Sequence, residues 1–92
     1  MMNRPPPILD GARVLWWAWA GDIPFFQHGS DAIFGFAVCR YESGKVYRFT
    51  CTKDWEVVND AACAYDESAA KMSIPGNCDA SRVHWTRYEF EE

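Results

Sequence analysis

The sequence predicts an α+β domain, a single, mostly antiparallel sheet of four to five strands with one short helix packed on one face, for three reasons. Apolar segments of strand length alternate with turn signals over residues 12–58. One segment, after Asp66, combines a helix N-cap with good helix formers. A chain of 92 residues that is 49% hydrophobic and 24% charged suits one folded domain. The expected order is strand, strand, strand, strand, helix, strand.

Residues 1–8 are predicted to be a flexible Pro-rich tail, and residues 9–92 to be the single α+β domain. Pro5, Pro6 and Pro7 favour an extended polyproline path, which makes no ladder hydrogen bonds. We therefore expect this segment to lie along the surface or to be mobile.

The first strand is predicted over residues 12–20, between an Asp-Gly and a Gly-Asp turn signal. Arg13 alone interrupts its apolar character, which is typical of a central strand that is covered on both faces. One short helix cannot cover both faces of such a sheet. The second face should therefore be closed by the loop of residues 21–31 or buried against another chain.

Residues 32–41 and 45–52 are predicted to form a β-hairpin around a Glu-Ser-Gly turn. Pairing Tyr41 with Val46 gathers the large apolar side chains of both strands on one face, and this separation of apolar from polar partners favours that register. The predicted apolar face contains Phe34, Phe36, Val38, Tyr47, Phe49 and Cys51, and the predicted polar face contains Arg48, Thr50 and Thr52.

The second half of the chain should supply two further strands and the helix. A short strand is predicted over residues 55–58 and a last strand over residues 81–90. Between them, Asp66 should cap a helix of two to three turns, which the Pro-Gly-Asn sequence at 75–77 ends.

The cysteines and the apolar runs indicate a cytoplasmic protein with reduced thiols and no membrane partner. Residues 1–7 lead into proline rather than into an apolar signal segment. The longest apolar run, residues 14–20, is about a third of the roughly 20 residues that span a bilayer. In the expected hairpin register Cys39 faces away from Cys51, so no cross-strand disulfide is expected. The thiols are Cys39, Cys51, Cys63 and Cys78.

Catalysis, a cofactor and a metal site are not expected. Phosphate-loop, nucleophile-elbow and zinc-protease motifs are missing from the sequence, and no two cysteines have the spacing of a zinc ligand pair. His28 and His84 are the general-base candidates at neutral pH. His84 falls in a predicted strand, and His28 neighbours Ser30 and Asp31 in a loop, whereas a catalytic triad assembles from separated segments. The cysteines are more typical of small core residues than of nucleophiles.

Nucleic-acid binding is an alternative that the charge of the chain makes unlikely. The net charge of -4 and the pI near 5.0 repel polyanions over most of the surface. Sheets that bind single strands do present aromatic side chains among basic groups. The residues with that alternation are Arg40, Arg48, Arg82 and Arg87 with Tyr41, Tyr47, Trp85 and Tyr88.

The aromatic content of 16% is more than a small core easily hides. Trp16, Trp17 and Trp19 must leave both faces of one strand, and Trp and Tyr are enriched at interfaces. We predict a non-catalytic protein-interaction module that forms a homodimer or binds a partner protein through an aromatic-rich sheet face. The alternative is a small-ligand-binding protein with a Trp/Phe-lined pocket between sheet and helix. The interface or ligand-lining candidates are Trp16, Trp17, Trp19, Phe25, Phe26, Trp55, Trp85 and Tyr88.

A resemblance rests on the runs Trp19–Phe25 and Gly35–Tyr41, followed by Tyr47–Phe49 and Trp55-Glu56. These runs resemble small uncharacterised single-domain proteins of the bacterial accessory gene pool, such as gene-cassette products and immunity-like partners. The resemblance covers about the middle half of the chain. It implies a bacterial, cytoplasmic setting and carries no catalytic residue.

Overall fold

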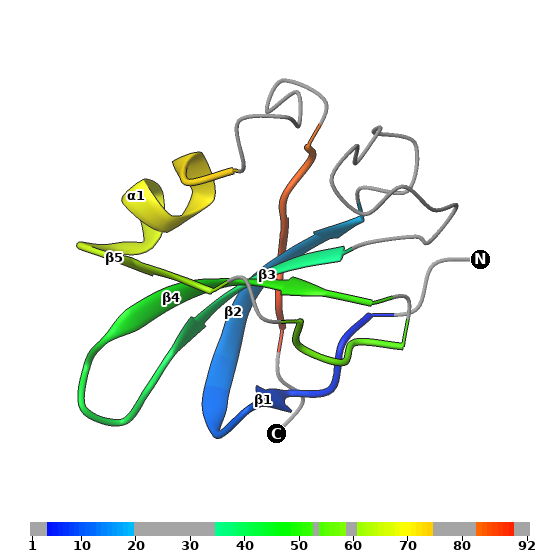
Figure 1. Cartoon of the computed structure of the whole chain (residues 1–92), viewed down its shortest axis with the longest axis horizontal. Helices are drawn as coiled ribbons and strands as arrows, with labels where there is room; N and C mark the ends of the chain where they lie inside the picture. Colours follow the sequence, from blue (N-terminus) through cyan, green and yellow to red (C-terminus); the bar gives the residue numbers. More distant parts are fainter. Residues whose placement is uncertain (1–3, 20–34, 53, 59–60, 75–82, 90–92) are drawn as a thin grey trace.

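The computed structural model describes residues 4–19, 35–52, 54–58, 61–74 and 83–89. In these residues the chain forms a six-stranded antiparallel sheet with one short helix against it, which confirms the predicted α+β fold (Figure 1). The elements are β1 (Ile8–Leu9), β2 (Ala12–Trp19), β3 (Gly35–Arg40), β4 (Val46–Cys51), β5 (Ala62–Ala64), α1 (Glu67–Met72) and β6 (Thr86–Arg87).

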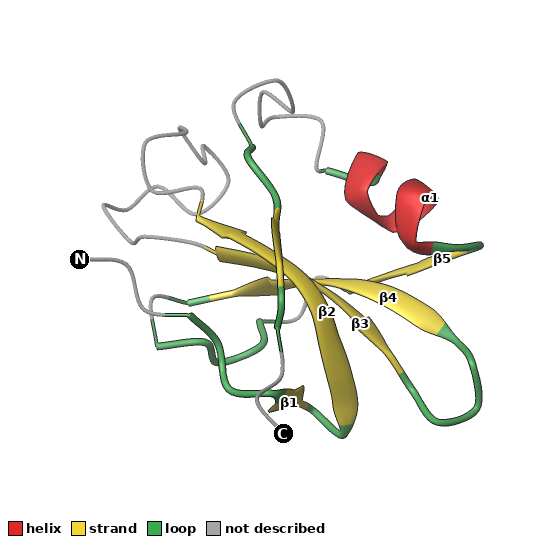
Figure 2. Cartoon of the chain, turned by 180° about the vertical axis from the view of Figure 1, so that it is seen from behind, coloured by secondary structure: helices red, strands yellow, loops and turns green. Residues whose placement is uncertain are grey.

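Strand β2 is the centre of the architecture, as its apolar sequence predicts. The sheet runs in the order β1-β2-β3-β4-β5, and β6 also pairs with β2. β1 pairs with the first residues of β2, whereas β6 pairs with Trp16 and Trp17 further along it. A register irregularity between Val14 and Trp16 frees the Leu15 carbonyl, which accepts a 2.9 Å hydrogen bond from the Tyr88 amide. The C-terminal segment therefore runs beside β2, as both views of the fold show (Figures 1 and 2).

The hairpin of β3 and β4 has a register one residue away from the predicted one, so the predicted pairing of Tyr41 with Val46 is wrong. Val46 pairs with Arg40 instead, and the Tyr41 amide donates to the Lys45 carbonyl at 2.8 Å. The turn is thus three residues long, and Gly44 adopts a φ of 97° that glycine accommodates without strain.

The physical reason for the different register is that both faces of the hairpin are buried. Phe36 and Val38 lie opposite Thr50 and Arg48, on the face that carries the helix, and we call this the helix face. Arg48 is only 3% exposed, because its Nε donates to the Ser73 carbonyl at 3.0 Å and its Nη1 donates to Thr50 Oγ1. A polar side chain with such partners can occupy a core position. The polar residues Arg48 and Thr50 therefore do not mark a solvent-exposed face of the hairpin.

The corrected register also places Cys39 and Cys51 on one face of the sheet, which we call the opposite face. Their partners across the strands are Tyr47 and Gly35, so the two cysteines share a face without lying opposite each other. The prediction that Cys39 faces away from Cys51 is wrong. Both are free thiols in the structure, as is the exposed Cys63, while Cys78 lies outside the described residues.

Helix α1 begins where the sequence predicts and is shorter than expected. The Asp66 side chain accepts a 2.8 Å hydrogen bond from the Ala69 amide, which is the predicted N-cap. The helix has six residues rather than two to three turns, and it ends at Ser73 before the predicted proline stop. Ala70 is fully buried and packs on Val38 and Val46 of the helix face. Figure 2 shows α1 lying at the β4–β5 end of the sheet.

Two predicted strands are reduced or displaced. In the segment 55–58 only Val57 forms an isolated bridge, with Cys51, because Trp55 adopts a φ of 63° that interrupts an extended strand. The strand on the edge of β4 away from β3 is β5, further along the chain. Within the described part of the predicted last strand, only Thr86–Arg87 forms a ladder, with β2.

The described part of the predicted tail, residues 4–8, lies against the sheet. Pro5 is buried, and its carbonyl accepts a 2.9 Å hydrogen bond from the Tyr88 hydroxyl. The Pro7 carbonyl accepts another from the Val14 amide, also at 2.9 Å. The sheet thus begins at Ile8, inside the segment that was expected to precede it.

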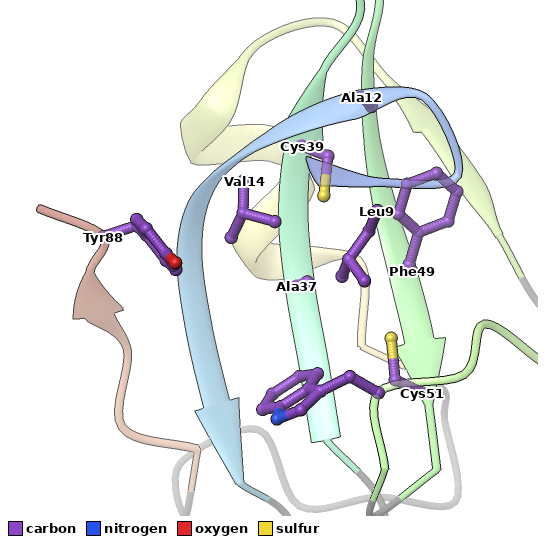
Figure 3. Packing of buried hydrophobic residues seen from close by; sticks show 9 residues of the cluster. Leu9, Ala12, Val14, Ala37, Cys39, Phe49, Cys51 and Tyr88 are labelled. Atoms are coloured by element: carbon purple, nitrogen blue, oxygen red, sulfur yellow. The ribbon is translucent and has the colours of Figure 1, made fainter. Parts of the chain in front are cut away.

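Three described segments of the chain itself cover the opposite face, whereas the loop of residues 21–31 that was expected to close it lies outside the described residues. Leu9 from β1, Trp55 from the segment after β4, and Tyr88 from the C-terminal segment cover this face. Figure 3 shows Tyr88 beside β2 and Leu9 between the strands. The buried cluster consists of Leu9, Ala12, Val14, Ala37, Cys39, Phe49, Cys51, Trp55 and Tyr88.

Candidate functional site

Three of the predicted interface tryptophans pack against one another on the opposite face. The Trp55 ring meets Trp17 edge-on at 6.0 Å between ring centroids and lies 4.8 Å from Trp19. Trp55 is 6% exposed and covers Gly35, where an added Cβ would meet the indole at 2.8 Å. Trp55 is thus a core residue, whereas Trp17 and Trp19 are half-buried and pack against that core.

The other predicted site residues are distributed over both faces. Trp16 and Trp85 are half-buried on the helix face. The ring centroids of Trp85 and Phe36 lie 6.4 Å apart there. Tyr88 is buried on the opposite face. Phe25 and Phe26 lie outside the described residues. The structure therefore does not bring the described candidates together into one aromatic surface.

The large apolar side chains that are exposed among the described residues are different ones, which the sequence analysis missed. Tyr65 is 95% exposed, Met72 is 81% exposed and Ile8 is 54% exposed. Their positions beside a helix cap, at a helix end and in a short strand carried no periodic signal that distinguishes them from core residues.

A groove of about 600 Å³ lies where Trp16 of β2 meets β6, β3 and the start of α1. Three arginines come to it from three neighbouring strands, because Arg13 pairs with Arg40 and Trp16 pairs with Arg87. The groove is lined by Ile8, Gly11, Arg13, Leu15, Trp16, Arg40, Tyr41, Glu42, Glu67, Arg87 and Tyr88.

Trp16 is the centre of this groove and is held by α1. Its indole N–H donates to Glu67 Oε1 at 2.7 Å, and Glu67 Oε2 accepts from Arg40 Nη2 at 3.0 Å. The Lys71 ammonium lies 3.6 Å from the centroid of the Trp16 ring, and the Arg87 guanidinium lies 5.8 Å from it. The Trp16 side chain thus links β2 to the helix, β3 and β6. The cationic groups of Lys71 and Arg87 lie close to its ring.

The groove is cationic in a chain whose net charge is -4. Its carboxylates are Glu42 and Glu67, and Glu67 accepts hydrogen bonds from both Trp16 and Arg40. Arg87 is exposed, and its contact in the described structure is with the Trp16 ring. The structure therefore concentrates positive charge in this groove, although the chain as a whole is acidic.

The arginine pair on β2 and β3 is unfavourable for the sheet alone. Arg13 and Arg40 are direct cross-strand partners, and like charges in that position destabilise an antiparallel pair. The ion pair of Arg40 with Glu67 offsets part of the repulsion, although both side chains are substantially exposed, which keeps its contribution small.

The buried thiols have no nucleophilic character at neutral pH. Burial raises the pKa of the Cys51 thiol to about 12. Burial, together with the nearby Cys51, also raises the pKa of the Cys39 thiol. Because the thiolate is the reactive form, these raised pKa values disfavour a nucleophilic role for either thiol at neutral pH. The described residues contain no cluster of three or more His, Cys, Asp or Glu side chains that could hold a metal ion.

No family model, curated protein or solved structure matches the chain. The resemblance to bacterial accessory proteins therefore stays a prediction. Within the described residues, no helix has the length and apolar character needed to cross a membrane.

The arginine groove was not predicted as one site, although its arginines were noted separately in the sequence. Arg40 and Arg87 appeared in the alternation considered for nucleic acid, and Arg13 appeared as the one polar residue of an apolar strand. Arg13 was the usable signal, because it is the one charged residue of an otherwise apolar predicted strand.

Proposed function

We propose that this chain is a non-catalytic protein-interaction module that binds an acidic segment of a partner protein in the groove around Trp16. One observation carries the proposal: arginines from β2, β3 and β6 converge on one groove of an otherwise acidic chain. The planar guanidinium fork matches a carboxylate with two parallel hydrogen bonds, so arginines are well suited to acidic side chains.

The composition of the groove favours a protein segment over a nucleic acid. Ile8 and Leu15 provide apolar contacts that amino-acid side chains can use. Glu42 and Glu67 would repel a regularly spaced phosphate chain, whereas discrete carboxylates can avoid them. The net charge of -4 also opposes a polyanion at long range.

A Trp/Phe-lined pocket between sheet and helix, the alternative from the sequence, has less support. Ala70 of α1 packs directly on Val38 and Val46, so small side chains fill the layer between helix and sheet there. The groove lies instead beside Trp16, and its lining contains more charged groups than aromatic ones.

Calorimetric titration with a short peptide of alternating Glu and Ser tests the proposal. We expect saturable binding that is lost when Gln replaces Glu, because the guanidinium groups then have no charged partner. Arg87→Gln should weaken binding at least about tenfold, the value of one charge-assisted hydrogen bond. Lys45→Gln removes the same charge from an exposed site outside this groove and should change the affinity less than about threefold.

Three results would contradict the proposal: no binding of the acidic peptide, equal losses in the two variants, or tighter binding of a single-stranded oligothymidylate. Self-association through the sheet is the other form of an interaction module. Sedimentation equilibrium at micromolar protein distinguishes it, since a module for a different partner should be monomeric there.

A further inference from the structure

A second groove, of about 490 Å³, lies on the other side of Tyr41 and differs from the first in character. It shares Gly11, Tyr41 and Glu42 with the arginine groove but contains none of its arginines. Its lining is Asp10, Gly11, Tyr41, Glu42, Ser43, Lys45, Tyr47, Phe49 and Ala61.

Aromatic rings form a corner in this groove. Tyr41 and Tyr47 stand nearly perpendicular, with 87° between their planes and 5.6 Å between ring centroids. Phe49 lies two residues further along β4, on the same face, and its ring is within 7° of parallel to that of Tyr47 at 6.0 Å. Tyr41 and Tyr47 are half-buried, so each keeps part of its ring accessible, whereas Phe49 is buried.

The orientation of Tyr41 is fixed by the neighbouring turn. Its hydroxyl donates to the Asp10 carbonyl at 3.1 Å. Asp10 and Gly11 both have positive φ, at 51° and 82°, which directs that carbonyl toward the tyrosine. The corner is therefore built by the β1–β2 turn and the β3–β4 hairpin together, before any ligand is present.

The charge around the corner is negative. The exposed side chains of Asp10 and Glu42 line the groove, against the single cation Lys45. Aromatic faces attract cations through their quadrupole, so an accessible ring face of this edge-to-face tyrosine pair can contact a cation. Carboxylates at the rim add to that attraction.

We propose that this corner binds a small organic cation with a quaternary ammonium group. A quaternary ammonium has no N–H donors and is held by ring faces and by nearby carboxylates, which are what the corner offers. The site goes beyond the arginine groove, which attracts the opposite charge.

The test compares choline with its uncharged carbon isostere, dimethylbutanol, which has the same shape without the charge. Binding is followed by the change in proton chemical shifts of the tyrosine rings. Choline should bind saturably and at least about tenfold more tightly than the isostere, because only the charged ligand gains from ring and carboxylate. Tyr47→Phe keeps the ring and should leave the choline affinity within about threefold, whereas Tyr47→Leu should reduce it at least fivefold.

Two controls separate loss of choline binding from unfolding and from failure of the arginine groove. Far-ultraviolet circular dichroism shows whether Tyr47→Leu is folded, and the choline-to-isostere comparison on the unaltered protein requires no variant. Arg87→Gln should leave choline binding unchanged, which separates failure here from failure of the acidic-peptide proposal. Equal affinity for choline and the isostere, absence of choline binding, or full binding by folded Tyr47→Leu would overturn the proposal.

Discussion

At the scale of single residues, Trp16 has both a structural and a proposed binding role. Its indole N–H reaches Glu67 at the start of α1, and its ring meets Lys71 from the end of the same helix. A helix of six residues has little stability of its own, so such side-chain contacts decide whether it stays docked. Trp16 and Glu67 both line the arginine groove.

Trp16→Phe should therefore reduce the free energy of unfolding by more than its loss of area explains. The phenyl ring has no donor for the Glu67 carboxylate, and a hydrogen bond to a charged group contributes about 1.5–3 kcal/mol, less when partly exposed as here. We expect a loss of about 1–2 kcal/mol in urea titrations. Trp85→Phe, at a half-buried tryptophan of the same face, is the control. Equal losses in the two variants would mean that the Trp16–Glu67 hydrogen bond contributes nothing.

Cys51 should make stability fall at alkaline pH. Burial raises the pKa of its thiol from 9.0 to about 12, so the folded state keeps a proton that the unfolded state releases. The resulting stabilisation is complete below pH 9.0 and is lost as the pH rises toward about 12. Unfolding titrations of Cys51→Ala across that window should show a shallower decline than the unaltered chain. Parallel curves would show that the Cys51 thiol has the same pKa in the folded and unfolded states.

At the scale of elements, the hairpin shows what local sequence can and cannot determine. Both strands and the glycine turn were predictable, because alternation and a Glu-Ser-Gly signal are local features. The register was not, because it depends on whether Arg48 faces water. The Ser73 carbonyl at the end of α1 receives this arginine, and that contact joins residues 25 positions apart. No pattern within the strand reveals such a partner.

Thr50→Val tests the corrected register. In the structure Thr50 is fully buried and its hydroxyl accepts from the Arg48 guanidinium, so valine would remove an acceptor from a buried charge. We expect a loss of about 1–3 kcal/mol in unfolding free energy by urea titration. Thr86→Val, on the exposed side of β6, should cost less than about 0.5 kcal/mol. A Thr50 variant as stable as the Thr86 variant would restore the register with Thr50 toward solvent.

At the scale of the whole molecule, the arginine groove exists because distant segments meet at β2. β6 brings Arg87 beside Trp16, across most of the chain length. The bulge after Val14 and the pairing with β3 bring Arg13 and Arg40 to the same place. Aromatic content predicted that some rings would serve an interface, but which rings stay accessible is decided by this topology. Trp55, for example, turns inward through its unusual backbone and is covered.

The charge distribution follows from the same topology. The chain has a net charge of -4, yet Arg13, Arg40 and Arg87 reach one groove and Lys71 lies on the tryptophan at its centre. An acidic partner would meet repulsion over most of the surface and attraction at this place, which confines binding to one orientation. The sequence showed these residues as scattered single charges, and only the fold assembles them.

The central claim, that an acidic segment binds at Trp16, is tested most directly by following tryptophan indole N–H resonances in isotope-labelled protein during titration with the Glu-Ser peptide. The Trp16 indole N–H donates to Glu67 in the groove, while Trp17 and Trp55 pack together on the opposite face of the sheet. Trp16→Phe assigns the resonance. We predict a saturable shift of the Trp16 indole signal with the Trp17 and Trp55 signals unmoved. Binding that shifts Trp17 and Trp55 and leaves Trp16 in place would contradict the claim.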